Sequence, residues 1–362
     1  LDRVVLAMEY LGDVRRDRVE EVRKAAHGCS IAGFGRARLR RELGRSGVVR
    51  DIGRHRRKGR RDFEPRTVGI ASLPVTLTDE TVLAIAVDPG RLAAGVVDSA
   101  GDVLVRDRIG TPSREVWRVL EQLVLRVLAA RPDDVPAPST VAVSCSGPID
   151  EPAGAVSPVA LPAWSGFPLR QHLEELTGLP VVLDTLAGAA AEGELRFGDS
   201  ISTASFVTLV LDRTIESACV IDGRRLRGAH GNAGSLAHLT VDPGGQTCPC
   251  GATGCLTALA SAIALEAEMN RPIRRATPSI VERTGIMVGR AIASAAAAFD
   301  VSTFLLSGTV VDTLGDPMLD AMRRELELRS HLPHLIDLQV IEPSGFVLPL
   351  TAASALVGTG SR

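Results

Sequence analysis

Three cysteines and one histidine lie close together in a glycine-rich stretch of this chain. Cys248, Cys250 and Cys255 follow His238 within a span of 18 residues. Three thiolates and one imidazole form a complete tetrahedral ligand set for a structural zinc ion. The glycines between the cysteines let a short loop fold closely around an ion. The stretch therefore predicts a structural zinc site, and zinc is the cofactor that we expect.

Two other interpretations of these cysteines stay open at this stage. The three thiols could be buried and free, with a histidine nearby by coincidence, although their clustering among glycines favours a metal. A disulfide is the second alternative. Cys248 and Cys250 are too close in sequence for easy bridging, and any bridge would leave a third thiol over.

Charge is distributed unevenly along the chain. The net charge of the 362 residues is -2, but residues 1–70 hold 19 Arg and Lys against 10 Asp and Glu. A basic segment on an acidic body predicts contact with a polyanion. Nothing in the sequence has the length of a membrane span or the pattern of a signal peptide. The free cysteines fit a reducing compartment, so we expect a cytoplasmic protein that does not contact a membrane.

The basic segment has the element order of a winged helix-turn-helix. We expect helices near 4–11, 15–26 and 30–43, a strand at 47–50, a basic loop at 54–61 and a return strand at 67–70. The third helix would enter the major groove of double-stranded DNA, and the loop would contact phosphates or the minor groove. An arginine-rich solvated surface is the alternative. The predicted DNA contacts are Arg36, Arg38, Arg40, Arg41, Arg54, Arg56, Arg57, Lys58, Arg60 and Arg61.

The rest of the chain alternates strands and helices, which predicts an α/β fold. Residues 71–82 are expected to form a linker, and a buried-type strand follows at 82–88. Residues 206–211 and 217–221 are predicted to form a hairpin. Helices are expected at 115–130, 169–177, 187–195, 257–268, 276–299, 315–329 and 349–358.

Four stretches of the chain form a recognisable set of motifs. The most specific is 231–255, supported by 146–150 (Ser-Gly-Pro-Ile-Asp), 161–166 (Leu-Pro-Ala-Trp-Ser-Gly) and 189–194 (Ala-Ala-Ala-Glu-Gly-Glu). They resemble the motifs of the ROK family, which groups bacterial sugar kinases with transcriptional regulators. The resemblance implies two actin-like lobes of the ribonuclease H-like ATPase type, and an N-terminal winged helix is a feature of the family's regulators. The implied domains are 1–70, the linker, a first lobe of 83–198 with 347–362, and a second lobe of 199–346 that holds the zinc loop.

The chain departs from the family pattern where the kinases bind phosphate. Family kinases begin with Asp-x-Gly-Gly-Thr, but residues 88–92 read Asp-Pro-Gly-Arg-Leu. The second phosphate loop is Gly-Thr-Gly-x-Gly in the family, whereas residues 212–216 read Asp-Arg-Thr-Ile-Glu. Loss of the glycines removes the close backbone approach that phosphate needs, and the carboxylates would repel it.

The catalytic and sugar-binding positions differ as well. The family's catalytic aspartate belongs to Asn-Asp-Ala-Asn, and residues 185–188 read Thr-Leu-Ala-Gly, which places Leu186 at the base position. Leucine cannot accept a proton from a sugar hydroxyl. Ser235 and Thr257 stand where the family has glutamates. Of the polar set that holds sugar, only His238 remains, so we expect no enzyme and no catalytic residue.

We therefore expect a DNA-binding transcriptional regulator, most simply a repressor, that binds an operator as a homodimer or homotetramer. Its kinase-inactive body would serve oligomerisation and the sensing of a sugar or another small-molecule effector. The first alternative is an ATP-dependent sugar kinase of the ROK family. A second is a regulator whose body is only a scaffold and binds no ligand.

Overall fold

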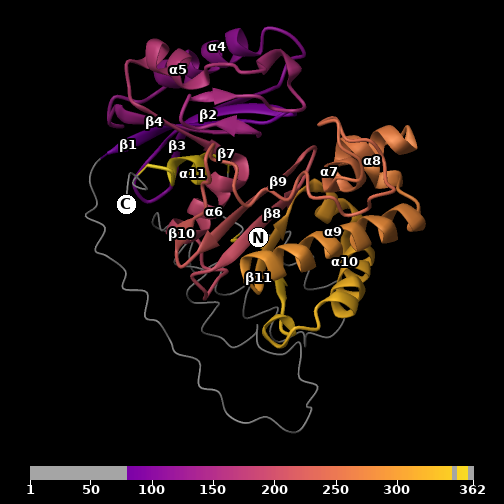
Figure 1. The fold of residues 1–362 in the computed structure, drawn as a ribbon. Helices are drawn as coiled ribbons and strands as arrows, with labels where there is room; N and C mark the ends of the chain where they lie inside the picture. Colours follow the sequence, from indigo (N-terminus) through magenta and orange to yellow (C-terminus); the bar gives the residue numbers. More distant parts are fainter. Residues whose placement is uncertain (1–79, 345–348, 358–362) are drawn as a thin grey trace, which may run out of the picture. The chain divides into compact units, whose positions relative to one another are not determined.

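The structure is a computed structural model, and it describes residues 80–344 and 349–357. The expected winged helix-turn-helix and all ten predicted DNA contacts lie outside the described residues. The chain divides into two compact units, 1–73 and 74–362. The described part, which belongs to the second of these units, contains two five-stranded sheets with helices packed on them (Figure 1).

The first sheet has the strand order β3-β2-β1-β4-β7. Strands β1, β2 and β3 form an antiparallel meander, and β4 and β7 extend the sheet in parallel. A small two-stranded sheet, β5 with β6, follows β4. The strands span Thr81–Val87 (β1), Arg91–Val97 (β2), Val103–Gly110 (β3), Pro138–Cys145 (β4), Ile149–Asp150 (β5), Ala155–Val156 (β6) and Val181–Thr185 (β7).

The second sheet, with the order β10-β9-β8-β11-β12, repeats this pattern. Its first three strands again form an antiparallel meander, and β11 and β12 again extend it in parallel. The chain therefore contains two topologically equivalent α/β lobes, one built on each sheet. The strands span Phe206–Leu211 (β8), Ile215–Ile221 (β9), Arg224–Arg225 (β10), Thr303–Ser307 (β11) and Gln339–Ile341 (β12).

Helices cover both sheets (Figure 1). The α-helices span Val116–Ala129 (α4), Leu169–Thr177 (α5), Leu186–Phe197 (α6), Leu256–Ala260 (α7), Ala262–Met269 (α8), Pro278–Phe299 (α9), Thr309–Arg329 (α10) and Pro349–Ser354 (α11). Short 3-10 helices span Pro162–Trp164 (η1), Ile273–Arg275 (η2) and Pro333–Leu335 (η3). None of the helices within the described ranges combines the length and the apolar character of a membrane span.

Strand β1 shows how the sequence assigns each face of the first sheet. Leu83 and Ile85 point to the face that α4 and α5 cover, in a core of large aliphatic side chains. The alternate residues Ala84 and Ala86 pack against Leu350 of α11 on the other face. Successive side chains of a strand point to opposite faces, so large residues fill one layer while alanines let a helix approach closely on the other.

Helix α6 lies between the two lobes and is built of small residues for that reason. Ala189 packs against Val82 and Ala142 of the first sheet. Ala187 and Ala191 pack in a cluster with Phe206, Ala218, Val220 and Leu305 of the second sheet. A helix that contacts sheets on two sides has little room for large side chains, because protein interiors are packed without voids.

Helices α9 and α10 pack side by side against the second sheet. A Cβ atom placed at Gly285 of α9 would lie 2.2 Å from the Met318 carbonyl oxygen of α10. Side chains of α9, including Val288 and Ile292, share a core with Leu209 of β8. Close packing of the Gly- and Ala-rich helix is what its composition predicts.

Two predicted boundaries are wrong and one helical segment is not predicted, each for a local reason. The linker cannot extend to residue 82, because β1 begins at Thr81, which is buried. Residues 257–268 are not one helix, because Ser261 ends α7 and caps α8 by accepting a hydrogen bond from the Ala264 N–H. The helix predicted at 315–329 is present, but another helical segment precedes it from Thr309, and the two segments of α10 meet at Gly315, whose φ of 58° and ψ of -152° are not helical.

Candidate functional site

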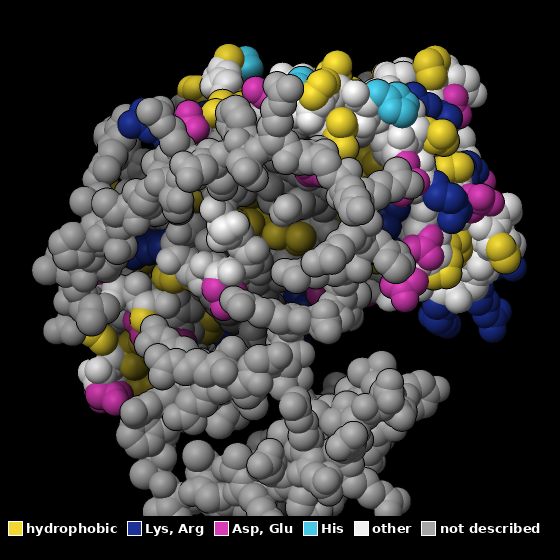
Figure 2. Space-filling model, turned by 90° about the horizontal axis from the view of Figure 1, so that it is seen from below, with side chains coloured by type: hydrophobic (Ala, Val, Ile, Leu, Met, Phe, Trp, Pro, Cys, Tyr) yellow, Lys and Arg dark blue, Asp and Glu magenta, His cyan; other side chains and the backbone are white. Residues whose placement is uncertain are grey.

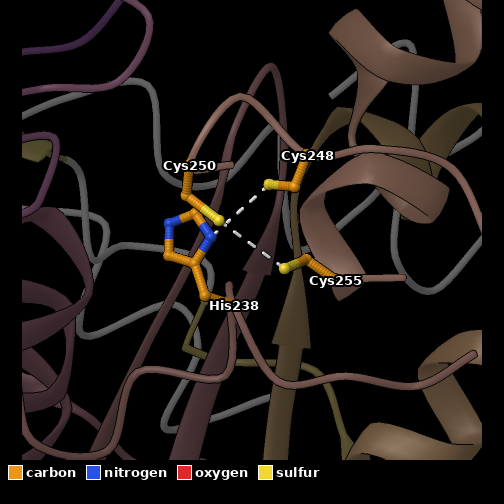
Figure 3. Close-up of side chains that lie close together, drawn as sticks. All are labelled: His238, Cys248, Cys250 and Cys255. Carbon is orange, nitrogen blue, oxygen red and sulfur yellow. Dashed lines mark hydrogen bonds between the residues drawn. The ribbon is translucent and has the colours of Figure 1, made fainter. Parts of the chain in front are cut away.

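The structure brings His238, Cys248, Cys250 and Cys255 together between β10 and α7. One ligand atom from each of the four lies within 4.8 Å of all the others. The Cys248 Sγ atom is 3.6 Å from His238 Nδ1, and the Cys250 Sγ atom is 3.7 Å from Cys255 Sγ. Figure 3 shows the four side chains pointing toward one another.

Backbone hydrogen bonds hold this loop independently of any ion. The Cys248 N–H donates to the Ala252 carbonyl, and the Leu256 N–H donates to the Leu239 carbonyl. Gly254 has a φ of 76°, and a Cβ atom there would lie 1.7 Å from the carbonyl oxygen of Asp242. Only glycine fits such a position. Gly254, directly before Cys255, therefore lets the loop turn back beside the 241–242 backbone.

The donor set and its spacing fit a tetrahedral zinc ion. Zn–S bonds of about 2.3 Å and Zn–N bonds of about 2.0–2.1 Å in a tetrahedron separate neighbouring donors by roughly 3.5–3.8 Å. The distances of 3.6 and 3.7 Å fall within this range. A disulfide needs an S–S distance of about 2.05 Å, and the cysteines in the described residues are free. The cluster can therefore hold a metal ion, and zinc is compatible with it.

The protonation of its cysteine and histidine side chains makes metal binding at this site depend on pH. Burial raises the pKa of the Cys255 thiol to about 12, so without an ion this residue keeps its proton near neutral pH. Desolvation lowers the pKa of His238, which favours the neutral imidazole that metals bind. Binding a metal must release the thiol protons, so we expect the affinity of the site to fall as the pH falls.

The turn between β1 and β2, where the family kinases hold phosphate, is closed by its own aspartate. The Asp88 carboxylate accepts hydrogen bonds from the N–H groups of Gly90 and Arg91, at 2.6 and 2.9 Å. Burial raises the pKa of Asp88, and the nearby Asp212 raises it further. Because the carboxylate already occupies two backbone donors of the turn, they are not free for an anion.

The turn between β8 and β9 lies close to the first turn. The Asp212 carboxylate accepts from the Arg213 N–H at 2.7 Å and from the Thr309 hydroxyl at 2.8 Å. A Cβ atom at Gly90 would lie 2.9 Å from Cδ of Arg213, so this side chain packs over the first turn. The Arg213 side chain therefore lies between the two turns.

At the position of the family's catalytic base, one side chain caps a helix and the next packs in an apolar cluster. Thr185 caps α6 by accepting a hydrogen bond from the Gly188 N–H at 3.0 Å. Leu186 is partly buried and packs in the apolar cluster that includes Leu350 and Ala353 of α11. Of the two other positions compared with the family, Thr257 donates its hydroxyl to the Ala237 carbonyl at 2.8 Å, while Ser235 is exposed.

Asp184, which immediately precedes this position, is part of a buried ion-pair network. Its Oδ2 atom lies 2.5 Å from Nη2 of Arg225 and 3.7 Å from Nη1 of Arg227. The side chains of Asp184 and Arg225 are 0% and 1% exposed. Burial raises the pKa of Asp184, and the charge of Arg225 opposes that rise. The pair joins β7 of the first sheet to β10 of the second.

From the sequence, Glu216 is expected only to repel phosphate through its carboxylate. In the structure, this carboxyl group makes a specific contact. Its Oε1 atom accepts a hydrogen bond from the Gly147 N–H at 3.0 Å, which links β9 of the second lobe to the end of β4 in the first. Burial raises the pKa of Glu216 to about 7, and the Gly147 N–H acts in the opposite direction. The signal that could have indicated this contact is that Glu216 directly precedes the predicted strand at 217–221, which is largely apolar.

Replacing Glu216 with glutamine should change how stability depends on pH. The folded-state pKa of about 7 exceeds the ordinary glutamate value of 4.5, so the folded protein binds more protons between these values. Stability of the wild type is therefore lost as the pH rises through this window, by on the order of 3 kcal/mol from this group. Glutamine does not ionise and still offers an oxygen to the Gly147 N–H.

Urea unfolding of both proteins at about pH 5 and about pH 8 measures this effect. The stability of Glu216→Gln relative to the wild type should increase between the two pH values. Glu174→Gln, which removes an exposed carboxylate from α5, controls for the loss of one charge. A pH-independent difference between Glu216→Gln and wild type would contradict the buried, protonated state of Glu216.

The two equivalent lobes and the loop between β10 and α7 define a protein with a sugar-kinase-like α/β fold. The ROK family model matches residues 83–335, so the chain belongs to the ROK family. It is 28% identical over 278 residues to a glucokinase of Streptomyces coelicolor, covering 67% of this chain and 86% of the relative. It is 24% identical to the N-acetylmannosamine kinase of Pasteurella multocida, covering 70% and 88% of the two chains.

Two solved structures share this fold. The ROK hexokinase from Thermus thermophilus superimposes with a TM-score of 0.65 and 28% identity, covering 76% of this chain and 97% of the hexokinase. A ROK family transcriptional regulator, homologous to the E. coli MLC protein, superimposes with a TM-score of 0.66 and 22% identity, covering 77% and 78%. The fold is thus found in both a kinase and a regulator, and does not by itself separate the two functions.

Proposed function

We propose that this protein is a DNA-binding transcriptional regulator, most simply a repressor, whose body does not phosphorylate sugars. The proposal rests on what lies at the position of the family's catalytic base. There Leu186 packs into an apolar cluster, and the nearby Asp184 is held by Arg225. No carboxylate at this position is available to accept a proton from a sugar hydroxyl. The excess of basic residues in 1–70 supports binding to a polyanion.

Occupied backbone donors support the same proposal. Asp88 takes two N–H groups of its own turn, and Asp212 takes an N–H group of the neighbouring one. Anion binding by a turn requires free N–H groups, and two carboxylates beside them repel phosphate. The side chains on the described part of the face in Figure 2 include basic and acidic groups next to one another. We assign the proposed DNA contacts to residues 1–70 because these residues carry the basic excess of the chain.

The remaining features of the proposal follow from DNA recognition. A winged helix that binds two half-sites works as a symmetric oligomer, so we propose a homodimer or homotetramer on an operator. The zinc ion would hold the loop at 238–255 and take no part in chemistry. A small-molecule effector is proposed to act on the body, and with DNA as the partner we propose a cytoplasmic location.

Gel-shift titration against the DNA upstream of its own gene tests the proposal. The intact protein should bind that DNA more tightly than random DNA, and the affinity should fall steeply with salt because phosphate contacts release counterions. Replacing Arg36, Arg38, Arg40 and Arg41 with alanine should weaken binding and lower the salt slope by roughly 0.9 for each phosphate that the variant no longer neutralises.

Arg323→Ala combined with Arg324→Ala provides the control, because both arginines are exposed on α10 of the body. This double variant should bind DNA like the wild type. Binding that never exceeds binding to random DNA would refute the regulator, and equal losses in both sets of variants would refute the role of residues 1–70.

The second candidate is an ATP-dependent sugar kinase, which the names of the relatives favour. Purified protein should give no ATP-dependent phosphorylation of glucose, N-acetylglucosamine or N-acetylmannosamine, and magnesium ATP should not raise its melting temperature. Turnover above background with any of these sugars would revive the kinase. A sugar that raises the melting temperature without turnover would identify an effector and exclude a body that is only a scaffold.

A further inference from the structure

The four residues of the metal cluster differ sharply in how accessible they are. Cys248 and Cys255 are 2% and 0% exposed, whereas Cys250 is exposed. Solvent can therefore reach the sulfur of Cys250 more readily than the other two. A thiolate bound to zinc keeps a lone pair, so exposure decides which of the three a small oxidant reaches first.

The exposed sulfur has a partner at short range. Cys250 Sγ and Cys255 Sγ are 3.7 Å apart, and both side chains point to the centre of the cluster (Figure 3). Forming a disulfide requires an approach to about 2.05 Å, which a shift in the exposed segment between them can supply. Gly251, next to Cys250, has a φ of 91° and would have no neighbour within 4 Å of an added Cβ, so this segment has room to move.

We propose that Cys250 is an oxidation site, and that a hydroperoxide converts Cys250 and Cys255 into a disulfide and releases the zinc ion. The Cys250 sulfur attacks the peroxide and becomes a sulfenic acid, and one oxygen leaves as water. The Cys255 sulfur then displaces the second oxygen as water and forms the S–S bond. The two zinc-bound thiolates together lose two electrons, hydrogen peroxide takes these electrons and two protons from solvent to become two waters, and the zinc leaves as Zn²⁺.

Loss of two of its four ligands then leaves only His238 and Cys248 for the zinc ion, too few for a structural site. Cys255 directly precedes α7, and its backbone pairs with Thr240. Oxidation would thus alter the connection between the loop and α7 in the second lobe. A thiol reductant with added zinc should restore the original state, because a disulfide is a reversible product.

The inference rests on zinc in the cluster and is independent of DNA binding. Its test uses the full chain, loaded with zinc and purified in the presence of a reductant. The reductant is removed before hydrogen peroxide is added. A chromogenic chelator follows zinc release, and mass spectrometry of alkylated tryptic peptides locates the oxidised cysteines. The three ligand cysteines share the tryptic peptide that runs from Gly228 to Arg274, because the bond between Arg271 and Pro272 resists trypsin, while Cys145 and Cys219 lie on other peptides.

Zinc release should follow the same time course as the loss of two hydrogens from the tryptic peptide that carries the three ligand cysteines. Fragmentation of this peptide should place the disulfide between Cys250 and Cys255. Cys145 and Cys219 are 0% exposed in strands and should stay reduced. Free N-acetylcysteine in the same solution serves as an internal reference thiol. If the protein still holds its zinc when all of the N-acetylcysteine is oxidised, the proposal is overturned. A disulfide through Cys248, or earlier oxidation of Cys145 or Cys219, would also overturn it.

A matched pair of variants tests the role of Cys250 directly. Cys250→His and Cys248→His each keep four ligand groups, but only the first removes the exposed thiol. Cys250→His should release zinc at least about tenfold more slowly than the wild type under peroxide, whereas Cys248→His, which keeps the Cys250 and Cys255 thiols, should still form the disulfide and release its zinc. Equal rates in the two variants would contradict the proposal. If neither variant retains zinc, peptide mapping of the wild type still decides the question.

Discussion

Cys255→Ser should abolish stoichiometric zinc binding and markedly lower the melting temperature. Cys255 is fully buried, and its sulfur is one of four donors that meet in the cluster. A ligand that binds only the folded state stabilises it by about 4 kcal/mol when its free concentration is roughly a thousand times its Kd. Because structural zinc binds far more tightly than most ligands, a loss on the order of 4 kcal/mol or more is expected.

Metal analysis and thermal unfolding measure this effect, with Cys219→Ala as the control. Cys219 is a buried free cysteine of β9 and is not a member of the cluster, so its variant should lose packing energy but retain zinc. Stripping the wild type with a strong chelator should lower its melting temperature toward that of Cys255→Ser. If wild type and Cys255→Ser contain equal zinc and melt together, the cluster does not hold a structural metal.

Arg225→Met should destabilise the protein by about 3–5 kcal/mol, because it leaves a buried carboxylate without its closest partner. The Asp184 Oδ2 atom is 2.5 Å from Arg225, and neither side chain is accessible to water. Arg227, at 3.7 Å and about one third exposed, is too distant to replace the lost hydrogen bond.

The loss should be larger at high pH than at low pH. Burial raises the pKa of Asp184, and removing Arg225, whose charge opposes that rise, should raise it further. The folded variant would then bind a proton that the unfolded chain releases, so its stability falls as the pH increases. Denaturant unfolding at two pH values would detect the difference.

A double-mutant cycle separates the pair from its surroundings. Asp184→Asn combined with Arg225→Met removes both charges and should recover most of the stability, giving a large coupling energy between the two sites. Arg224→Met, one residue away and exposed, should change stability by no more than about 0.5 kcal/mol. Additive effects of Asp184→Asn and Arg225→Met would show that the contact does not join the two lobes energetically.

The local pattern of the chain predicts many of the helices and strands well. Helix α5 spans Leu169–Thr177, the range expected from its apolar spacing, and β8 spans Phe206–Leu211 as expected. Periodicity identifies such segments because each buries one face or lies fully within the core. The errors at Ser261 and Gly315 occur where a single residue changes the backbone inside a helical pattern, which periodicity cannot detect.

The candidate metal site is predictable because its chemistry is local. All four ligands fall between His238 and Cys255, and few other arrangements of three cysteines and a histidine at that spacing make physical sense. The backbone hydrogen bonds that shape the loop are not predictable, because they depend on pairings such as that of Thr240 with Cys255.

The order of residues along the chain is enough to predict the α/β class, the candidate metal ligands and the residues that we compare with the family's phosphate loops and base. What those replacements do depends on the folded structure. Glu216 meets a backbone N–H 69 residues away, and Asp184 meets Arg225 41 residues away. Such contacts join separate sheets, and a pattern along the chain carries no information on which distant groups meet. Packing of the surrounding core brings these groups together, and each of them would destabilise the fold if it were buried without a hydrogen-bond partner.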